Sequence, residues 1–538
     1  MTSQWRRARD REPERRPALP VWPTTLSNGE FLPPSPSSRQ LAMTRLMLDT
    51  LADQAARRGM DRRRFLTTSG AMAASLTVLN ACATGDDAAS PAASSSTSTT
   101  STGTAAPSTN TTPSTTTQGD PGGEFVVPDP EDDEACEIEL GSQGEFIFDI
   151  HTHHVMPEGV WRENARRIER MIGNLVPAGC NEADRLECLN RVAYVTNMFL
   201  GSDTTFALLS DVPNSGPLDA PLPWDAKVGT AELMDALTVA GQPRVLIHDV
   251  IAPNFGDLRT RLDDMALTAE TGRVSAFKVY TAWGPGNQGY SLADPAIGIP
   301  VVEQAQSLGV TTMCAHKGLP LQEFDRRFNG PDDICAVAAQ FPDMNFVVYH
   351  SAYEIQTTER AYDPASTATG INSLVKAMDD HGIPANGNVW CELGTTWRET
   401  MNNPTEAAHV LGKLLTRVGE DRVMWGTDGI WLGSPQRQIE AFRTFQITEA
   451  FQAEHGYPAL TDQVKAKVFG LNAANLFGVD PQGVTCGIDT DLLIASKGEL
   501  QVLVDDGLVP NPYEPIGYVT RRDVLRWWQT NPKPDLPV

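Results

Sequence analysis

Short apolar runs alternate with amphipathic stretches between residues 144 and 480, and this alternation constrains the fold more than any other feature. The amphipathic stretches with the apolar spacing of helices include residues 295–308, 405–418, 435–448 and 461–476. The apolar runs lie at residues 146–150, 205–210, 244–249, 275–280, 310–316, 344–350, 389–392 and 422–427. Strands that alternate with helices are typical of a parallel sheet. Eight such units over this length predict an α/β fold, a (β/α)8 TIM barrel, with a helical insertion at residues 161–197.

The N-terminal residues 1–82 have the features of an export leader. Arg62-Arg63-Arg64-Phe65-Leu66 is similar to a twin-arginine motif, and the apolar run at residues 67–81 is too short to span a membrane. Leu79-Asn80-Ala81-Cys82 resembles a bacterial lipobox, in which Cys82 would be lipidated. We expect a disordered leader, a twin-arginine export route and a lipid anchor in the cell envelope. The alternative is that these residues are no export signal but a disordered N-terminus in which the apolar patch occurs by chance.

Two further segments flank the predicted barrel. Residues 83–143 begin with a tract of Ser, Thr, Ala and Pro and end in an acidic lead-in. Such a composition cannot bury a core, so it predicts a disordered tether. After residue 480, short helices are expected near 498–505 and 521–529, and we expect residues 481–538 to pack on the barrel as a C-terminal extension.

The charge and the cysteines limit the partners. The formal net charge is −25, although the first 81 residues are basic. The rest of the chain is so acidic that it repels nucleic acid and anionic membranes. The remaining partners are a small-molecule substrate, a membrane contacted only through the leader or a lipid, and further copies of the same chain. The eight cysteines have no zinc-knuckle spacing. Cys180 and Cys188 are close enough to pair, whereas Cys314 and Cys391 are expected to be buried thiols.

Side chains suited to metal binding or proton transfer end several of the predicted strands. The first strand ends in His151-Thr152-His153. Residues two apart on a strand point the same way, so both imidazoles can reach one metal ion at about 2.0–2.1 Å. The later strand ends add Lys278, His316, His350, Glu392 and Asp428. Barrel enzymes keep their chemistry at these ends. For the first strand alone, two solvated histidines remain the alternative.

This ordered set resembles the amidohydrolase superfamily. H-x-H on the first strand, His on the fifth and sixth and Asp on the eighth are most similar to the amidohydrolase-2 branch, which also holds metal-dependent non-oxidative decarboxylases. Domains of that branch commonly finish with a helix reading K-I-x-x-x-N-A-x-x-L-F-G. The segment from Lys467 to Gly478 reads K-V-F-G-L-N-A-A-N-L-F-G. The resemblance covers residues 144–480.

The resemblance implies a metal site and an acid–base pair. His151, His153, His316 and Asp428 would hold one divalent metal, Zn²⁺ by their donor types, with Mn²⁺ as the alternative. The metal lowers the pKa of a bound water towards about 7. Asp428 would be both ligand and base, and His350 would polarise a substrate carbonyl or shuttle a proton.

The remaining strand-end residues are expected to face the substrate. In binuclear relatives the fourth-strand lysine is carbamylated, but the resemblance to a mononuclear branch favours an unmodified Lys278 that binds a substrate anion. Glu392 would contact substrate or support the site. The aromatics Tyr280, Trp283, Trp397 and Trp431 follow strand ends and would form an apolar wall.

Three functions of different class follow. The first is a metal-dependent hydrolase, in which activated water attacks the carbonyl of a small amide, ester or lactone. The second is a non-oxidative decarboxylase of a small carboxylic acid. The third is a non-catalytic binding lipoprotein at the cell surface. The acid–base pair of His350 and Asp428 favours an enzyme, because storing a metal requires neither group.

Overall fold

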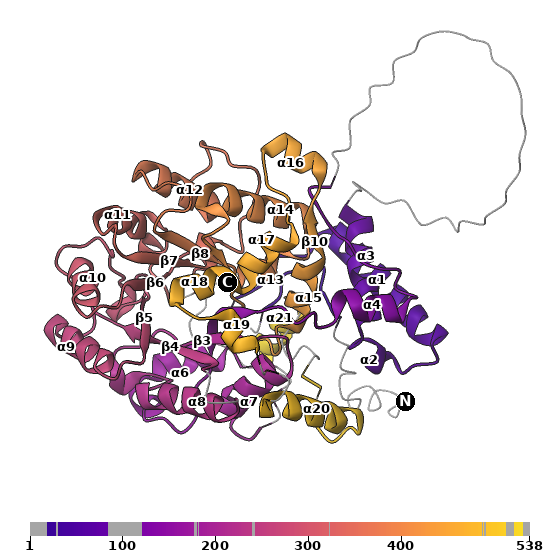
Figure 1. The fold of residues 1–538 in the computed structure, drawn as a ribbon, viewed down its shortest axis with the longest axis horizontal. Coiled ribbons are helices and arrows are strands. Elements are labelled where there is room, and N and C mark those ends of the chain that lie inside the picture. The colour runs from indigo at the N-terminus through magenta and orange to yellow at the C-terminus, as the bar shows by residue number, and fades with distance from the viewer. Residues whose placement is uncertain are drawn as a thin grey trace, which may run out of the picture.

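The structure, a computed structural model, forms a closed barrel of eight parallel strands (Figure 1). It describes residues 19–27, 31–83, 121–176, 180, 182–238, 243–321, 323–486, 488, 491–509, 511–512 and 521–530. The strands are β2 (Phe148–His153), β3 (Phe206–Ser210), β4 (Val245–Ile251), β5 (Val274–Val279), β6 (Thr312–His316), β7 (Asn345–Tyr349), β8 (Val389–Glu392) and β9 (Val423–Met424). A parallel bridge between Thr152 and Gly429 joins the last strand to the first. The predicted TIM barrel and its strands are confirmed.

The barrel core follows from the alternation of side chains along each strand. Phe148, Phe206, Val347 and Met424 fill the interior, and their neighbours in sequence pack outward against the helices. The main outer helices are α8 (Trp224–Ala236), α9 (Leu258–Ala269), α10 (Gly298–Ser307), α11 (Asp332–Gln340), α12 (Gly370–Asp380), α14 (Pro404–Lys413), α15 (Gln436–Thr444), α17 (Asp462–Ala466) and α18 (Asn472–Phe477). Each of the four helices predicted between residues 295 and 476 has a counterpart among these outer helices.

Shorter elements decorate the barrel. The predicted insertion after β2 contains α5 (Trp161–Asn164), α6 (Arg166–Gly173), η2 (Arg185–Leu189), α7 (Arg191–Val195) and η3 (Thr196–Leu200). The others are η4 (Pro217–Asp219), η6 (Pro285–Asn287), η7 (Arg326–Phe328), η8 (His350–Ala352), α13 (Thr396–Thr400), η9 (Leu414–Gly419), α16 (Glu449–His455), η10 (Lys467–Leu471) and α19 (Pro481–Thr485). Cys180 and Cys188 form the expected disulfide, and the thiols of Cys314 and Cys391 are free and buried.

The side chain of Asn472 connects the segment that ends the barrel to the last barrel strand. Its amide donates hydrogen bonds of 2.8 Å to the carbonyls of Glu420 and Val423. These bonds tie α18 to the start of β9. Gly478 then ends α18 in the left-handed conformation, with φ 67°, which glycine adopts without strain.

The C-terminal extension packs along the barrel wall near the insertion. Its helices are α20 (Leu492–Asp505) and α21 (Arg521–Thr530). Lys497 Nζ donates a 2.8 Å hydrogen bond to the carbonyl of Ser202, and Arg244 forms a buried ion pair with Asp491. α20 begins earlier than predicted, at Leu492.

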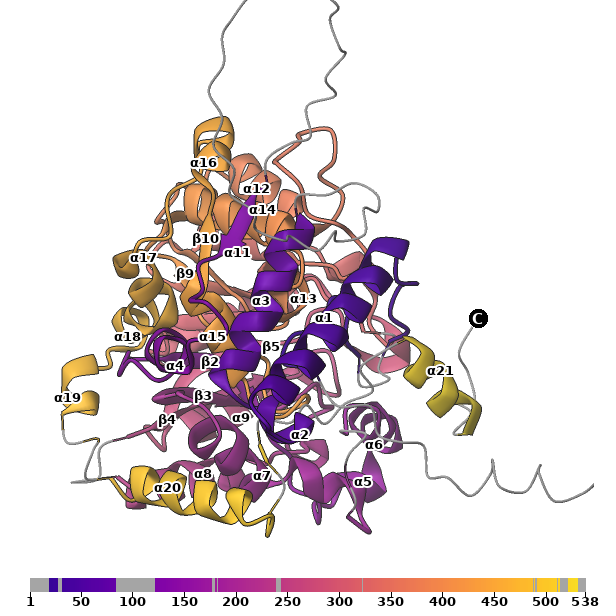
Figure 2. The ribbon, with the colours of Figure 1, turned by 90° about the vertical axis from the view of Figure 1, so that its right-hand side faces the viewer.

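The expected disorder of the leader is wrong for residues 38–83. They form α1 (Ser38–Arg57), α2 (Arg62–Phe65) and α3 (Ser69–Ala83), which lie along one side of the barrel and face the viewer in Figure 2. The apolar run is buried in the main core, with Leu76 and Leu79 fully covered. Burial of apolar surface stabilises this arrangement, and α3 reaches α14 and α15.

The acidic lead-in is ordered as well, contrary to the predicted tether. β1 (Gly123–Phe125) pairs antiparallel with β10 (Phe445–Ile447), and α4 (Asp133–Leu140) packs on α3. The side chain of Asn80 makes hydrogen bonds of 2.7 and 2.8 Å to the backbone of Phe125. The low-complexity part of the tether, residues 84–120, lies outside the described residues.

The export motifs therefore lie in packed helices. Arg62 and Arg63 begin α2, and Cys82 is half-buried near the end of α3. Within the described residues, no helix combines the length and the apolarity needed to cross a membrane. Export and lipidation stay predictions.

Replacement of Leu79 tests whether α3 belongs to the folded body. Leu79→Ala removes a fully buried side chain and is expected to lower the free energy of unfolding by about 2–5 kcal/mol. Leu41→Ala on α1 is the matched control, because Leu41 is 46% exposed and its loss should cost less than about 0.5 kcal/mol. Denaturant titration of purified protein measures both. Equal stability of the two variants would show that α3 does not pack on the barrel.

Candidate active site

The two histidines at the end of β2 are each oriented through the Nδ1 atom of the ring. His151 Nδ1 lies 3.1 Å from Glu392 Oε1, and His153 Nδ1 lies 3.0 Å from the carbonyl oxygen of Ser210. Both partners are acceptors, so each Nδ1 carries the proton and each Nε2 keeps its lone pair. Burial lowers the pKa of His151 far below its usual value and that of His153 to about 3. Both rings are therefore neutral donors suited to a metal.

Asp428 faces the Nε2 atoms of both histidines from the loop that follows β9. Its Oδ1 lies 3.5 Å from His151 Nε2 and 3.4 Å from His153 Nε2. Thr395 Oγ1 donates a 2.8 Å hydrogen bond to Oδ2, and Trp431 Nε1 donates a 3.1 Å hydrogen bond to Oδ1. Asp428 has φ 57°, a conformation that costs free energy in a non-glycine residue and is concentrated at functional sites.

The three side chains fit a divalent metal. Their donor atoms lie within 4.8 Å of one another, and two imidazoles with one carboxylate are common ligands of zinc and manganese. The partners of the two Nδ1 atoms also match the arrangement in which a second hydrogen bond orients a ligating histidine.

His316 does not join this donor group, in contrast to the expected four-ligand set. Its Nδ1 lies 3.1 Å from His350 Nε2, and its Nε2 lies 3.1 Å from the carbonyl oxygen of Leu319. Among the described residues, the groups of donor atoms that lie within 4.8 Å of one another do not include His316. His316 still lines the same pocket as His151, His153 and Asp428.

His350 sits in a strained turn directly after β7. Its φ is 61°, and those of Ser351 and Ala352 are also positive, which costs free energy in non-glycine residues. Its Nδ1 lies 2.9 Å from the carbonyl oxygen of Gly394. Burial is the main cause that lowers the pKa of His350 to about 4. The ring is thus neutral near pH 7 and able to accept a proton.

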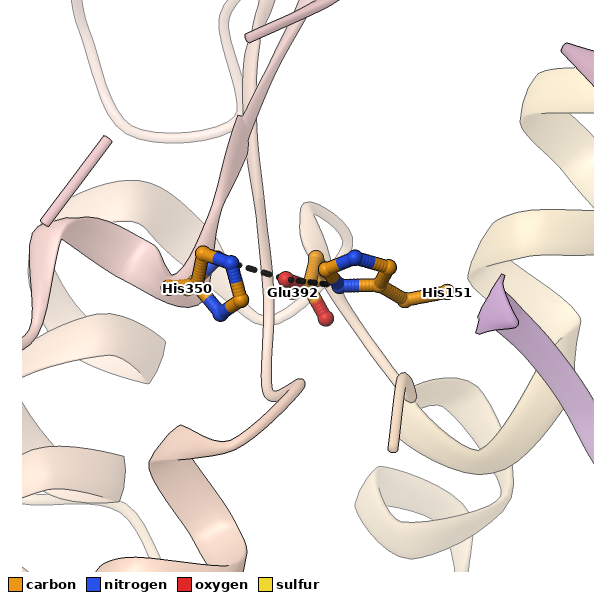
Figure 3. Close-up of side chains that lie close together, drawn as sticks. All are labelled: His151, His350 and Glu392. Carbon is orange, nitrogen blue, oxygen red and sulfur yellow. Dashed lines mark hydrogen bonds and ion pairs between the residues drawn. The ribbon is translucent and has the colours of Figure 1, made fainter. Parts of the chain in front are cut away.

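Glu392 lies between His151 and His350 and contacts both residues (Figure 3). Its Oε1 accepts a 2.5 Å hydrogen bond from the backbone N–H of His350 and lies 3.1 Å from His151 Nδ1. Burial raises the pKa of Glu392 to about 8. A Cβ at Gly426 would lie 2.1 Å from Glu392 Oε2, so glycine is needed there. Glu392 does not line the pocket and contacts His151, which favours the supporting role over the substrate contact among the two roles considered from the sequence.

Lys278 is also buried beneath the pocket and does not line it. Its Nζ donates a 3.2 Å hydrogen bond to His151 Nε2 and lies over the ring of Tyr349. Burial is the main cause that lowers its pKa to about 8. The structure therefore places Lys278 against a candidate metal ligand. The sequence had predicted that Lys278 binds a substrate anion, but its side chain does not line the pocket.

The pocket above these groups has a cavity volume of about 60 Å³ and mostly apolar walls. Tyr280 and Trp431 line it as predicted. Trp283 and Trp397 do not, because they donate their indole hydrogen bonds to Asn214 and Gln438 and pack away from the pocket. The other apolar lining residues are Phe31, Met171, Leu175, Val212, Pro213, Leu319 and Leu321.

Three residues that the sequence did not single out shape the site. Asp149 accepts hydrogen bonds from the backbone N–H groups of His151 and Thr427, at 3.0 and 3.1 Å, and so joins the two strand ends that carry the donors. A carboxylate inside the apolar run of β2 was the available signal. Arg398 and Phe31 line the pocket. Arg398 directly follows Trp397, but Phe31 has no sequence pattern that points to the barrel.

Comparisons with known proteins were made by sequence and by fold. Residues 225–479 match the sequence model of a family described as amidohydrolase. This range contains His316, His350 and Asp428 and begins after His151 and His153. No curated protein sequence matches the chain.

Three solved structures illustrate the similar folds. The 5-carboxyvanillate decarboxylase LigW from Sphingomonas paucimobilis is 16% identical, with a TM-score of 0.40, covering 62% of this chain and 99% of its own. A putative 2-pyrone-4,6-dicarboxylic acid hydrolase from Pseudomonas putida is 15% identical, with a TM-score of 0.36, covering 62% and 98%. A dihydroxybenzoic acid decarboxylase from a Polaromonas species with bound manganese is 12% identical, with a TM-score of 0.36, covering 62% and 97%.

The strand order shows the fold, and the sequence match covers the third to eighth strands of the barrel, β4 to β9, and the loops between them. The chain is a TIM-barrel protein whose residues 225–479 match the amidohydrolase family.

Proposed function

We propose that this protein is a metal-dependent hydrolase that adds water to the carbonyl of a small amide, ester or lactone. The observation that carries the proposal is the convergence of His151, His153 and Asp428 on one point of a buried pocket at the carboxyl ends of the strands. The metal would be one zinc or manganese ion. The sequence match over residues 225–479 supports the same class of enzyme.

The chain's own residues supply the proton transfers and the geometry. A divalent metal held by His151, His153 and Asp428 would supply Lewis acidity towards water and a carbonyl oxygen. Asp428 Oδ2, held by the hydroxyl of Thr395, is placed to accept a proton from the attacking water. His350 is neutral and lines the same pocket, so it could take up the proton that comes from water and pass that proton on to the leaving group. Glu392 keeps the ring of His151 oriented.

Decarboxylation of a small carboxylic acid is the second candidate, because a specific observation favours it. Arg398 lines the same pocket as His350 and Asp428, and a guanidinium is suited to bind a carboxylate. The same metal site would then hold the acid whose carbon–carbon bond breaks. The apolar walls fit either substrate.

The fate of oxygen from water separates the two reactions. In ¹⁸O-labelled water, we expect label in the acid product of a carbonyl substrate, as determined by mass spectrometry. Release of carbon dioxide, with solvent deuterium on carbon in heavy water and no ¹⁸O in the organic product, would replace hydrolysis by decarboxylation. Binding of substrate without any product would leave only the non-catalytic class.

A further inference from the structure

Phe31 reaches the pocket from outside the barrel. The other described lining residues end or follow barrel strands or belong to the insertion after β2, whereas Phe31 precedes α1 in the chain. Its side chain is half-buried and shares the apolar part of the pocket wall with Met171 and Leu175. We call residues 19–27 and 31–37 the strap. A segment of the N-terminal region thus contributes to the wall of the site.

The pocket is nearly closed in this arrangement. Its cavity volume of about 60 Å³ has room for a few water molecules, since one water needs about 10–15 Å³. Pockets that hold small organic ligands have volumes of about 300–1,000 Å³. A substrate with a carbonyl group and an organic frame therefore needs part of the wall to move.

The barrel and the insertion are firmly held parts of this wall. His151 and His153 belong to β2, which pairs with β3 on one side and bridges to Gly429 on the other. On α6 of the insertion, Ile168 and Ile172 are buried in a hydrophobic core. Movement of either part would break strand hydrogen bonds or expose buried apolar side chains, and both changes cost free energy.

The strap is anchored at its two ends and has a cavity behind its middle. Leu19 and Trp22 are buried in the main core, and Ser37 caps α1 by accepting a 3.1 Å hydrogen bond from the backbone N–H of Gln40. Between these ends, strap residues such as Pro23 and Pro34 line a cavity of about 570 Å³. Its opposite wall is formed by the loop after η8 and the start of α14. A segment with so little packing behind it opens at low cost in free energy.

One hydrogen bond from the C-terminal extension latches the strap next to Phe31. Arg521 Nη1 of α21 donates a 2.5 Å hydrogen bond to the carbonyl of Pro33. Within the strap, Ser27 Oγ donates a 2.6 Å hydrogen bond to the carbonyl of Phe31. The position of Phe31 at the pocket therefore depends on local contacts and on this latch.

We propose that the strap is a gate of this pocket, in which Phe31 plugs the entrance and substrate enters when the middle of the strap lifts away from the barrel. This deepens the proposed function and rests on it in one respect, namely that this pocket is where the substrate reacts. The apolar wall retains the phenyl ring in the closed state. The fraction of molecules with a lifted strap then sets the apparent affinity of the pocket for its substrate.

Chemical labelling of the pocket histidines in the purified full-length protein tests the gate without turnover. Diethyl pyrocarbonate is a small reagent that acylates neutral imidazole. His316 and His350 line the pocket and are 4% and 1% exposed, so their acylation rate reports how often the pocket opens. Phe31→Ala removes the plug and is expected to raise this rate on the order of tenfold. Phe31→Leu keeps an apolar plug and should change it less than about threefold. Mass spectrometry of peptides measures both.

A second pair of variants tests the latch. Arg521→Gln removes the donor to Pro33 and should raise the acylation rate about two- to tenfold, the usual contribution of one hydrogen bond. Arg522→Gln changes the neighbouring, exposed arginine of α21 and should leave the rate unchanged. All rates are expressed relative to that of His381, which lies outside the pocket with a 27% exposed side chain. An unchanged ratio in both Phe31→Ala and Arg521→Gln would overturn the gate.

The outcomes separate this inference from the proposed function. If the acylation ratio rises in Phe31→Ala but the protein binds no divalent metal, the gate stands and the metal-dependent function fails. If metal content and ¹⁸O incorporation are as expected but neither variant changes the ratio, the function stands and the gate fails. Wild-type His316 and His350 that react as fast as His381 would show an open pocket and would also overturn the gate.

Discussion

Asp428→Asn is expected to lower turnover on the order of 10²–10⁴-fold, the usual contribution of a positioned general base. The amide keeps the shape of the carboxylate but cannot take a proton from water. Its neighbours Thr395 and Trp431 donate to Asp428 in the structure, and they can still donate to the amide oxygen at one position. Steady-state kinetics on the hydrolysed substrate measures the effect.

Metal occupancy must be separated from base catalysis in this variant, because asparagine is the weaker ligand. Turnover is therefore expressed per bound metal. Asp379→Asn is the control, since Asp379 pairs with Arg417 on the surface and should have no effect on turnover. Full activity of Asp428→Asn per bound metal would remove Asp428 from the role of base.

His151→Ala is expected to release the metal and to lower turnover by about 10³-fold or more. His151 contacts Asp428, Glu392 and Lys278. The substitution therefore removes a metal ligand, the imidazole that Glu392 orients. Lewis acidity contributes several kcal/mol of transition-state stabilisation, and each tenfold change in rate is about 1.4 kcal/mol.

His381→Ala is the matched histidine control. His381 lies outside the pocket and pairs with Asp332, so it should change neither metal content nor turnover. Metal content is measured by elemental analysis after dialysis, and turnover by the same kinetic assay. A His151→Ala protein that keeps its metal and its activity would show that the metal, if present, lies elsewhere.

The barrel was predictable because its signal is local. Apolar runs such as 344–350 are short and bounded, and the alternation of inward and outward side chains follows from strand geometry. The order of the strands follows from the chain order in a βα repeat. The leader was not predictable in this way. Its apolar run has the composition of a signal segment, and its place in the core depends on packing against α14 and α15, which are distant in sequence, as well as on α1 and α4.

The candidate site was predicted in part. His151 and His153 are two residues apart on one strand, so their shared direction could be read from the sequence. Asp428 was placed with them by resemblance, and the structure brings it within 3.5 Å of both rings.

His316 was predicted to be a metal ligand, and the structure places its ring differently because of contacts that the spacing of the motifs does not encode. The ring turns towards His350 and the carbonyl of Leu319, a loop contact. Lys278 was expected to bind substrate because of the resemblance to a mononuclear branch, and Glu392 either to contact substrate or to support the site, yet neither side chain lines the pocket. Depth along the barrel axis depends on the register between strands, which the sequence does not show.

Metal stoichiometry tests the central claim most directly. The account predicts about one zinc or manganese ion per chain in the purified, dialysed full-length protein, determined by elemental analysis. The ion should be lost from His151→Ala and retained in His381→Ala. A wild-type protein that binds no divalent metal under these conditions would contradict the claim that His151, His153 and Asp428 form a metal centre.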